Sequence, residues 1–90
     1  MITVTGSLIA ANAAEAELVQ KYLPDHISLS RAEPGCLTFD VVETDDPMVW
    51  ALDESFVDQA AFEAHQTRTK ASIWFEKTAP LKRDFQVSGS

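Results

Sequence analysis

Cysteine and glycine are scarce in this sequence, which has one cysteine, Cys36, and three glycines among its 90 residues. A single cysteine excludes an intramolecular disulfide framework and a cysteine-rich metal site, and it favours a reducing, cytoplasmic setting. No glycine-rich phosphate-binding loop is present. The two histidines, His26 and His65, fall in different predicted helices and form no metal-binding motif. The sequence therefore predicts neither a cofactor nor a metal ion.

Basic residues are also few, with 7 Lys and Arg against 14 Asp and Glu and a formal net charge of -7. This balance disfavours binding to nucleic acid or to an anionic membrane surface. No apolar run approaches the roughly 18 residues of a membrane span, and the first residues lack the basic and apolar regions of a signal peptide. We therefore expect a protein that works in the cytoplasm, without nucleic acid and without a membrane.

The composition is otherwise that of a folded globular chain, with 46% apolar and 23% charged residues. Its length allows one domain, which we expect to span residues 1–90. A domain of this size buries only about 60 to 65% of the surface of its unfolded chain. Association with a second copy would supply further burial.

The first third of the chain predicts a strand over residues 2–10 and a helix over residues 13–32. Asn12 is a suitable N-cap for this helix, with Leu18, Tyr22, Ile27 and Leu29 as its apolar contacts. Pro24 lies inside the span, where it predicts either a kink or a break between two helical pieces. The pair Pro34-Gly35 then ends the helix.

Two strands are predicted next, over residues 36–44 and 48–56, and the polar turn between them predicts an antiparallel hairpin. Leu37, Phe39 and Val41 alternate along one face of the first strand. In the second strand, Glu54 lies in a row that otherwise contains Trp50, Leu52 and Phe56. Its carboxylate is either solvated at the margin of the sheet or held in a pocket with a raised pKa.

The last third of the chain predicts two helices and a final strand. Asp58 caps a helix that starts at Gln59, and His65 shares the inward face of this helix with Phe62, which is typical of a hydrogen-bonded core histidine. A second helix is predicted over residues 68–78, with Trp74 and Phe75 as core aromatics or as the wall of a ligand site. Residues 82–88 form the last strand, with Phe85 and Val87 inward.

The order of these elements predicts an α+β fold, a ferredoxin-like split βαβ arrangement with a four-stranded antiparallel sheet and helices on one face. The other face of the sheet is then left open. Because residue Ile9 makes the outer side of the first strand partly apolar, we expect that face to be covered as well.

Three segments resemble the antibiotic biosynthesis monooxygenase family: Arg31 to Phe39, which contains the Glu-Pro-Gly-Cys-Leu turn, Glu54 to Phe56, and Ala61 to His65. The resemblance covers essentially the whole chain. It implies a dimeric α+β barrel, a homodimer in which two ferredoxin-like sheets pack through their open faces. It also implies a pocket in each subunit and, as in characterised members, oxygenation of hydroquinones or anthrone-like phenols without metal or flavin.

Such chemistry needs a base and a water-poor pocket for a small aromatic substrate, because the substrate itself supplies the electrons to dioxygen. His65 is the candidate base. Glu54 is the second catalytic candidate, orienting His65 or binding a substrate hydroxyl. Asn12 is a candidate substrate ligand, although its role as a helix cap explains it fully. The candidate substrate-binding walls are aromatic: Trp50, Trp74, Phe75, Tyr22 and Phe39.

Some residues depart from patterns in relatives. The haem-degrading branch uses an asparagine in the first strand and a later haem-ligand histidine, whereas this chain has Thr5-Gly6-Ser7 there and no histidine after His65. Haem degradation is therefore not expected. Two alternatives to a monooxygenase remain: a non-catalytic, stress-associated dimer that binds a small molecule, and an isomerase or lyase of a small carbonyl metabolite.

Overall fold

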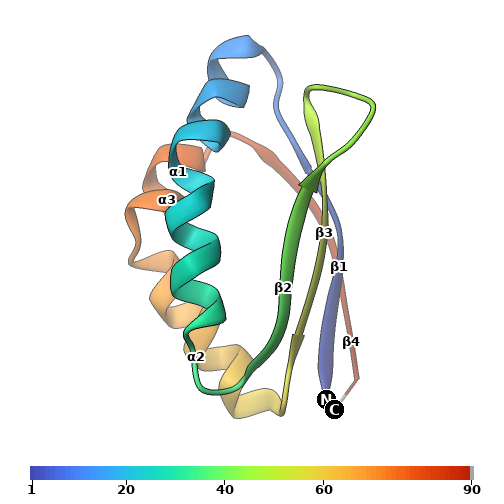
Figure 1. Ribbon diagram of the computed structural model, residues 1–90, viewed down its shortest axis with the longest axis vertical. Helices are drawn as coiled ribbons and strands as arrows, with labels where there is room; N and C mark the ends of the chain where they lie inside the picture. The colour runs from blue at the N-terminus through green and yellow to red at the C-terminus, as the bar shows by residue number, and fades with distance from the viewer. Residues whose placement is uncertain (90) are drawn as a thin grey trace.

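A four-stranded antiparallel sheet forms one layer of the molecule and three helices form the other (Figure 1). The computed structural model describes residues 1–89. The strands, in the spatial order β2-β3-β1-β4, and the helices have these bounds: β1 (Ile2–Ile9), α1 (Ala13–Arg31), β2 (Cys36–Glu43), β3 (Val49–Phe56), α2 (Gln59–Lys70), α3 (Ile73–Thr78) and β4 (Lys82–Gly89). The predicted α+β, ferredoxin-like fold is confirmed.

The inner face of the sheet carries the alternating apolar residues that the sequence predicted. In β3, Trp50, Leu52, Glu54 and Phe56 are all buried, and their neighbours on the central strand β1 are Ile2, Val4 and Leu8. Burying an apolar side chain of this size contributes roughly 1.5 to 3 kcal/mol. The two central strands therefore supply the floor of the core, and Glu54 is the one carboxylate on β3 in that row.

Gly6 allows the edge strand β4 to approach β1 closely. It pairs with Phe85 and has a φ of 147°, a conformation that other residues rarely adopt. A Cβ atom at residue 6 would overlap the carbonyl oxygen of Asp84. The glycine at this position therefore permits the close packing of β4 against β1.

Helix α1 is continuous through Pro24. Pro24 is exposed, so the carbonyl that loses its helical partner lies on the solvent side, where water can bind it. The side chain of Asn12 accepts a hydrogen bond from the backbone of Glu15 at 2.9 Å and caps the helix as predicted. The inward residues are Ala16, Val19, Leu23, His26 and Ser30, whereas Leu29 is 55% exposed.

The boundary between the last two helices was predicted incorrectly. Instead of a helix over residues 68–78, α2 continues to Lys70 and α3 begins at Ile73. The hydroxyl of Ser72 causes this break, because it donates to the Thr69 carbonyl at 2.6 Å and accepts from the Phe75 amide at 3.3 Å. Ser72 therefore ends one helix and caps the next.

Leu37 was also placed on the wrong face. The register between β2 and β3 shifts between Cys36 and Thr38, which is the signature of a bulge. The extra residue turns Leu37 outward, where it is 53% exposed, while Phe39 stays inward at 1%. Phe39 is thus directed under the helices, opposite Glu54 in the pairing register.

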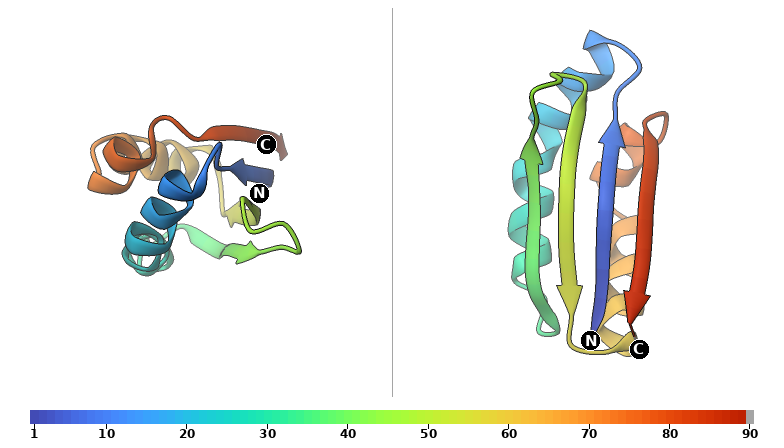
Figure 2. Two further views of the ribbon diagram at one scale, coloured as in Figure 1. Left: turned by 90° about the horizontal axis from the view of Figure 1, so that it is seen from above. Right: turned by 90° about the vertical axis from the view of Figure 1, so that its right-hand side faces the viewer.

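The three helices cover only one face of the sheet, and the other face has no helix over it (Figure 2). Helix α1 lies behind β2, and α2 and α3 lie behind β4 (Figure 2). The edge strand β4 is less well covered: Phe85 and Val87 face inward as predicted but remain 39% and 56% exposed. None of the helices in residues 1–89 is long and apolar enough to cross a lipid bilayer.

Candidate functional site

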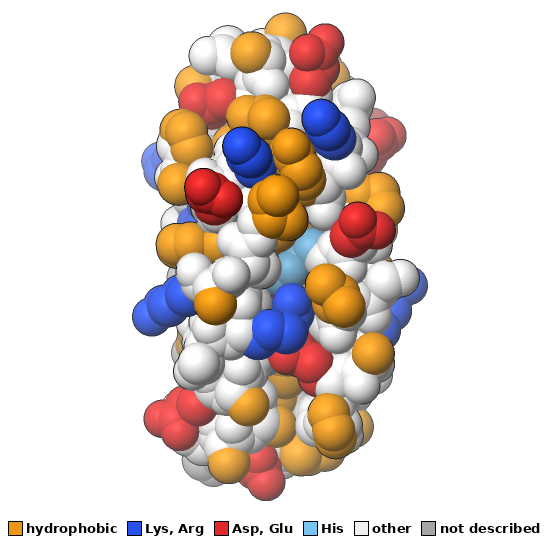
Figure 3. All heavy atoms as spheres, turned by 90° about the vertical axis from the view of Figure 1, so that its left-hand side faces the viewer, with side chains coloured by type: hydrophobic (Ala, Val, Ile, Leu, Met, Phe, Trp, Pro, Cys, Tyr) orange, Lys and Arg blue, Asp and Glu red, His pale blue; other side chains and the backbone are white. Residues whose placement is uncertain are grey.

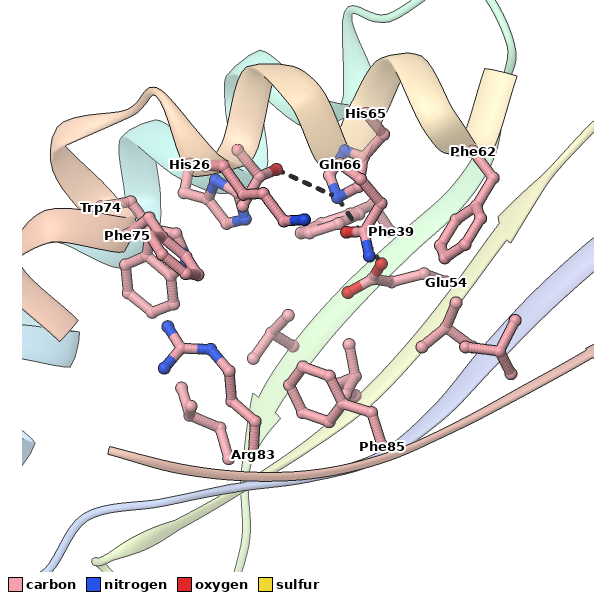
Figure 4. A pocket seen from close by; sticks show the side chains of 17 residues that line it. His26, Phe39, Glu54, Phe62, His65, Gln66, Trp74, Phe75, Arg83 and Phe85 are labelled. Carbon is pink, nitrogen blue, oxygen red and sulfur yellow. Dashed lines mark hydrogen bonds and ion pairs between the residues drawn. The ribbon is translucent and has the colours of Figure 1, made fainter. Parts of the chain in front are cut away.

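A cavity of about 230 Å³ lies between the inner face of the sheet and the helices. Every helix and every strand contributes at least one residue to its lining. Figure 4 shows side chains entering it from both layers, with the histidines and Trp74 coming from the helices above and Glu54 and Arg83 from the sheet below. The lining includes titratable and aromatic side chains: His26, Phe39, Glu54, His65, Trp74, Phe75 and Arg83.

His65 is placed in this cavity by the cap of α2. The carboxylate of Asp58 accepts a hydrogen bond from the Ala61 amide at 2.8 Å, which fixes the first turn and hence the direction of each later residue. His65 is 3% exposed and its ring packs against the rings of Phe56 and Phe39, at centroid distances of 4.9 and 5.4 Å. The imidazole is therefore almost completely removed from solvent.

Glu33 orients this imidazole. It lies in the turn after α1, and its Oε1 is 2.6 Å from Nδ1 of His65. Its other oxygen accepts a hydrogen bond from Nε of Arg68 at 3.0 Å, and Arg68 also donates to the Ser30 hydroxyl at 2.8 Å. Because the paired carboxylate is an acceptor, Nδ1 of His65 carries the hydrogen and Nε2 presents its lone pair.

The lone pair on Nε2 faces the cavity (Figure 4). Its neighbours are the Thr69 hydroxyl at 3.3 Å and Oε1 of Glu54 at 3.8 Å. Burial lowers the pKa of His65, although the hydrogen bond and the charge of Glu33 oppose this effect. A neutral imidazole whose Nε2 is an acceptor is the form that can take a proton from a ligand, once the ligand displaces the long contact with Thr69.

Glu54 is the acidic counterpart of His65. Its side chain is 10% exposed, and burial, followed by repulsion from Glu33 and Asp53, raises its pKa to about 8. Of the two alternatives that the sequence left open, the structure supports the buried carboxyl with a raised pKa. At neutral pH Glu54 is therefore protonated and can donate a hydrogen bond.

A second histidine, His26, shares the cavity. Its ring stacks on Trp74 at a centroid distance of 5.0 Å and an interplanar angle of 10°, and it meets the edge of Phe39 at 5.3 Å. The residue is 5% exposed, and its buried Nδ1 has no hydrogen-bond partner among the described residues. Burial lowers the pKa of His26 to about 3, so its ring is neutral and acts as part of the aromatic wall.

Both histidines are nearly closed off from the helical side of the molecule. Figure 3 shows that side, where histidine atoms are visible only in a narrow gap near the centre, next to basic side chains. On the helical side, this narrow gap is therefore where solvent approaches the histidines.

The structure brings five of the eight predicted site residues to the cavity: His65, Glu54, Phe39, Trp74 and Phe75. The other three lie elsewhere. Trp50 is buried in the core with Leu8 and Val19, Tyr22 packs against that cluster, and Asn12 caps α1. Tyr22 and Asn12 contribute nothing to the lining because α1 directs them to other parts of its surface.

Sequence reasoning missed Glu33, His26 and Arg83 as parts of the site. Glu33 is 32 residues from its partner His65, and no spacing rule links two positions at that distance. His26 could have been found, because it continues the buried stripe of Val19 and Leu23 on α1. Among residues 1–89, no group of three or more His, Cys, Asp or Glu side chains is arranged to hold a metal ion.

Comparison with known proteins gives a family and several similar structures. The model of the family described as antibiotic biosynthesis monooxygenase matches residues 1–77. A protein from Nitrosomonas europaea, provisionally assigned as such a monooxygenase, is 21% identical with a TM-score of 0.77, over 100% of this chain and 98% of its own. A protein from Deinococcus radiodurans with the same provisional assignment is 18% identical with a TM-score of 0.77, over 100% and 92% of the two chains.

A conserved protein of unknown function from Bacteroides thetaiotaomicron is similar too, with 15% identity, a TM-score of 0.73, and coverage of 97% of this chain and 94% of its own. At such identities these structures show a shared fold and not a shared substrate. No curated protein matches the chain in sequence.

Proposed function

Because the chain belongs to the antibiotic biosynthesis monooxygenase family, we propose that it is a small, cofactor-independent monooxygenase that oxidises a quinol or polyphenol with O₂. The observation that carries this proposal is the pairing of a neutral His65 with a protonated Glu54 in a largely apolar cavity. His65 is the base, Glu54 is the acid, and the aromatic walls hold the substrate ring.

The first step is removal of a phenolic proton by Nε2 of His65. The substrate hydroxyl replaces the long 3.3 Å contact from Thr69, while Glu33 holds the imidazole and stabilises the imidazolium that forms. The electron-rich phenolate passes one electron to O₂, and the resulting radical and superoxide combine to form a carbon–oxygen bond.

The second step uses Glu54. Its carboxyl donates a proton to the distal oxygen of the peroxide. The O–O bond then breaks as the carbon that bears the peroxide gives its hydrogen, as a proton, back to the Glu54 carboxylate, which leaves one oxygen atom on the substrate as a new carbonyl. The departing hydroxide takes the proton held by the His65 imidazolium and leaves as water, so both side chains return to their starting states. One O₂ is consumed for each water and each oxygenated product, so electrons and atoms balance without another reductant. A buried acid with a pKa of about 8 is protonated at neutral pH, as this step requires.

Oxygen uptake by metal-free protein with a panel of hydroquinones tests the proposal. We expect His65→Ala to reduce the rate by about 100-fold or more, the usual contribution of a general base, and added imidazole to restore part of it. Glu63→Ala, on the exposed side of the same helix, is the matched control and should keep the rate of the parent protein. Equal rates for the His65→Ala variant and the parent would refute the assigned role.

One observation also favours an isomerase of a small carbonyl compound. An acid and a base whose atoms lie 3.8 Å apart, Glu54 and His65, can move a proton between two carbons without O₂. Turnover that continues under argon and still depends on His65 would support this alternative. Saturable ligand binding with no turnover in air or argon would support a non-catalytic binding protein.

We also propose that two copies associate through the open face of the sheet, which has no helix over it (Figure 2). An unpaired sheet face of a chain this small gains burial from a partner. Sedimentation at micromolar concentration should give a dimer, and a monomer would contradict the proposal.

A further inference from the structure

Arg83 is a half-buried cation in the cavity, and it has no acidic partner within residues 1–89. It lies on the inner face of β4, opposite Leu8 of β1, and lines the cavity. No Asp or Glu carboxylate in residues 1–89 forms an ion pair with it, although the chain has 14 acidic residues against 7 basic ones. Half-buried charges are normally paired, so a missing counterion is informative.

The contacts of Arg83 hold its guanidinium in place without neutralising it. One terminal nitrogen donates to the Thr78 carbonyl at 2.9 Å and more weakly to that of Leu81 at 3.4 Å, and the other donates to the Thr78 hydroxyl at 2.7 Å. These acceptors are neutral and belong to Thr78, the last residue of α3, and to Leu81 in the turn that follows, so Arg83 has a structural role there. A guanidinium has five N–H groups, and Arg83 therefore retains donors for a ligand.

The surrounding charges leave the cavity positive. Lys70 lines it at the exposed rim and adds a second cation. Glu54 is neutral at neutral pH because its pKa is about 8, and the charge of Glu33 is balanced by Arg68. The interior of an otherwise acidic protein thus attracts an anion.

The positions of these groups specify where the anion lies. Figure 4 shows the guanidinium of Arg83 beneath Trp74 and Phe75, away from Glu54 and His65. The Phe75 ring centroid is 5.4 Å from the guanidinium carbon. A cavity of 230 Å³ is below the range of about 300 to 1,000 Å³ of drug-sized ligands, which suits a single ring.

We propose that the substrate is a single-ring phenol that carries a carboxylate, with the carboxylate bound by Arg83 and the phenolic hydroxyl placed between His65 and Glu54. This inference rests on the proposed function for the role of the hydroxyl. The carboxylate supplies the counterion that Arg83 lacks, and it orients the ring so that the hydroxyl meets the base. A planar guanidinium is well suited to a carboxylate, since it can bind both oxygens at once.

A matched pair of ligands tests this without turnover. 4-Hydroxybenzoate and 4-hydroxybenzamide have nearly the same shape and differ in charge, and both are stable to air. Titration calorimetry or NMR should show that the parent protein binds the carboxylate at least about tenfold more tightly than the amide, as a charged hydrogen-bonded pair predicts. Because only binding is measured, this result does not depend on whether the protein consumes O₂.

Two variants complete the experiment. Arg83→Gln should abolish the preference for the carboxylate, and Lys82→Gln, which removes the same charge from the adjacent, exposed position, should keep it. Circular dichroism checks that Arg83→Gln folds, and if it does not, the comparison of the two ligands on the parent protein still decides. Equal affinity for the two ligands, binding of neither, or a preference that survives in folded Arg83→Gln would overturn the proposal.

Discussion

The buried carboxyl of Glu54 predicts a stability that falls as the pH rises. In the folded protein the pKa of Glu54 is about 8, whereas in the unfolded chain it returns to the ordinary value of 4.5. Between these two pH values the unfolded chain has released a proton that the folded protein still holds. The stabilisation is therefore complete below pH 4.5 and is lost progressively as the pH rises toward 8.

The size of the effect follows from the same two pKa values. Each pH unit inside this window changes the free energy of unfolding by about 1.4 kcal/mol. Between pH 5 and pH 8, the parent protein should lose about 3 to 4 kcal/mol relative to a Glu54→Gln variant, whose amide does not titrate. This is a large fraction of the 5 to 15 kcal/mol that is typical of a folded domain.

Urea unfolding of both proteins at pH 5 and pH 8 measures this difference. The contributions of His26 and His65 cancel, because both proteins contain them. Glu63→Gln, an exposed position on α2, is the control and should give a difference that does not change with pH. If the Glu54→Gln difference were also flat, Glu54 would ionise normally in the folded state, and its role as a proton donor at neutral pH would fail with it.

Two further predictions concern His26 and Gly6. Because burial lowers the pKa of His26 from 6.5 to about 3, the folded protein should lose stability as the pH falls below 6.5. His26→Phe should remove about 3 kcal/mol of that loss at pH 4, and thermal unfolding of both proteins at pH 4 and pH 7 measures the difference. In Gly6→Ala, the added Cβ would overlap the Asp84 carbonyl, and alanine would have to adopt a φ of 147°. Urea unfolding should therefore show that the free energy of unfolding falls by about 2 kcal/mol or more. An unchanged urea midpoint would contradict the close approach of β1 and β4.

Local chemistry made much of the fold predictable. Asn12 and Asp58 act as helix caps at the positions where the sequence placed them, since capping depends on residues only three positions away. The row that carries Glu54 was likewise visible from alternation along one strand. One prediction failed where two local preferences competed: apolar periodicity favours a single helix over residues 68–78, but the Ser72 hydroxyl ends one helix and caps the next. Pro24 was expected to kink or to break the first helix, and the continuous α1 excludes the break.

The candidate site was less predictable because it depends on contacts between distant segments. His65 and Glu54 were recognisable as residue types on buried faces, but the hydrogen bond that orients His65 comes from Glu33, in the turn after α1. Arg83 carries no sequence signal at all: its significance comes from the carboxylates that are missing around it, which only the packing of β4 against α3 reveals. The bulge at Leu37 similarly depends on how β2 meets β3.

The pairing of β1 with β4 has a consequence for how the protein is made. Ile2 lies opposite Gly89, so the first and last strands meet only after a loop of nearly the whole chain has closed. Such non-local contacts slow folding, and one edge of β1 stays unpaired until β4 has left the ribosome. Arg83, Phe85 and Val87 arrive with β4. The cavity is thus completed only when β4 pairs with β1, and no nascent chain that lacks β4 encloses a ligand.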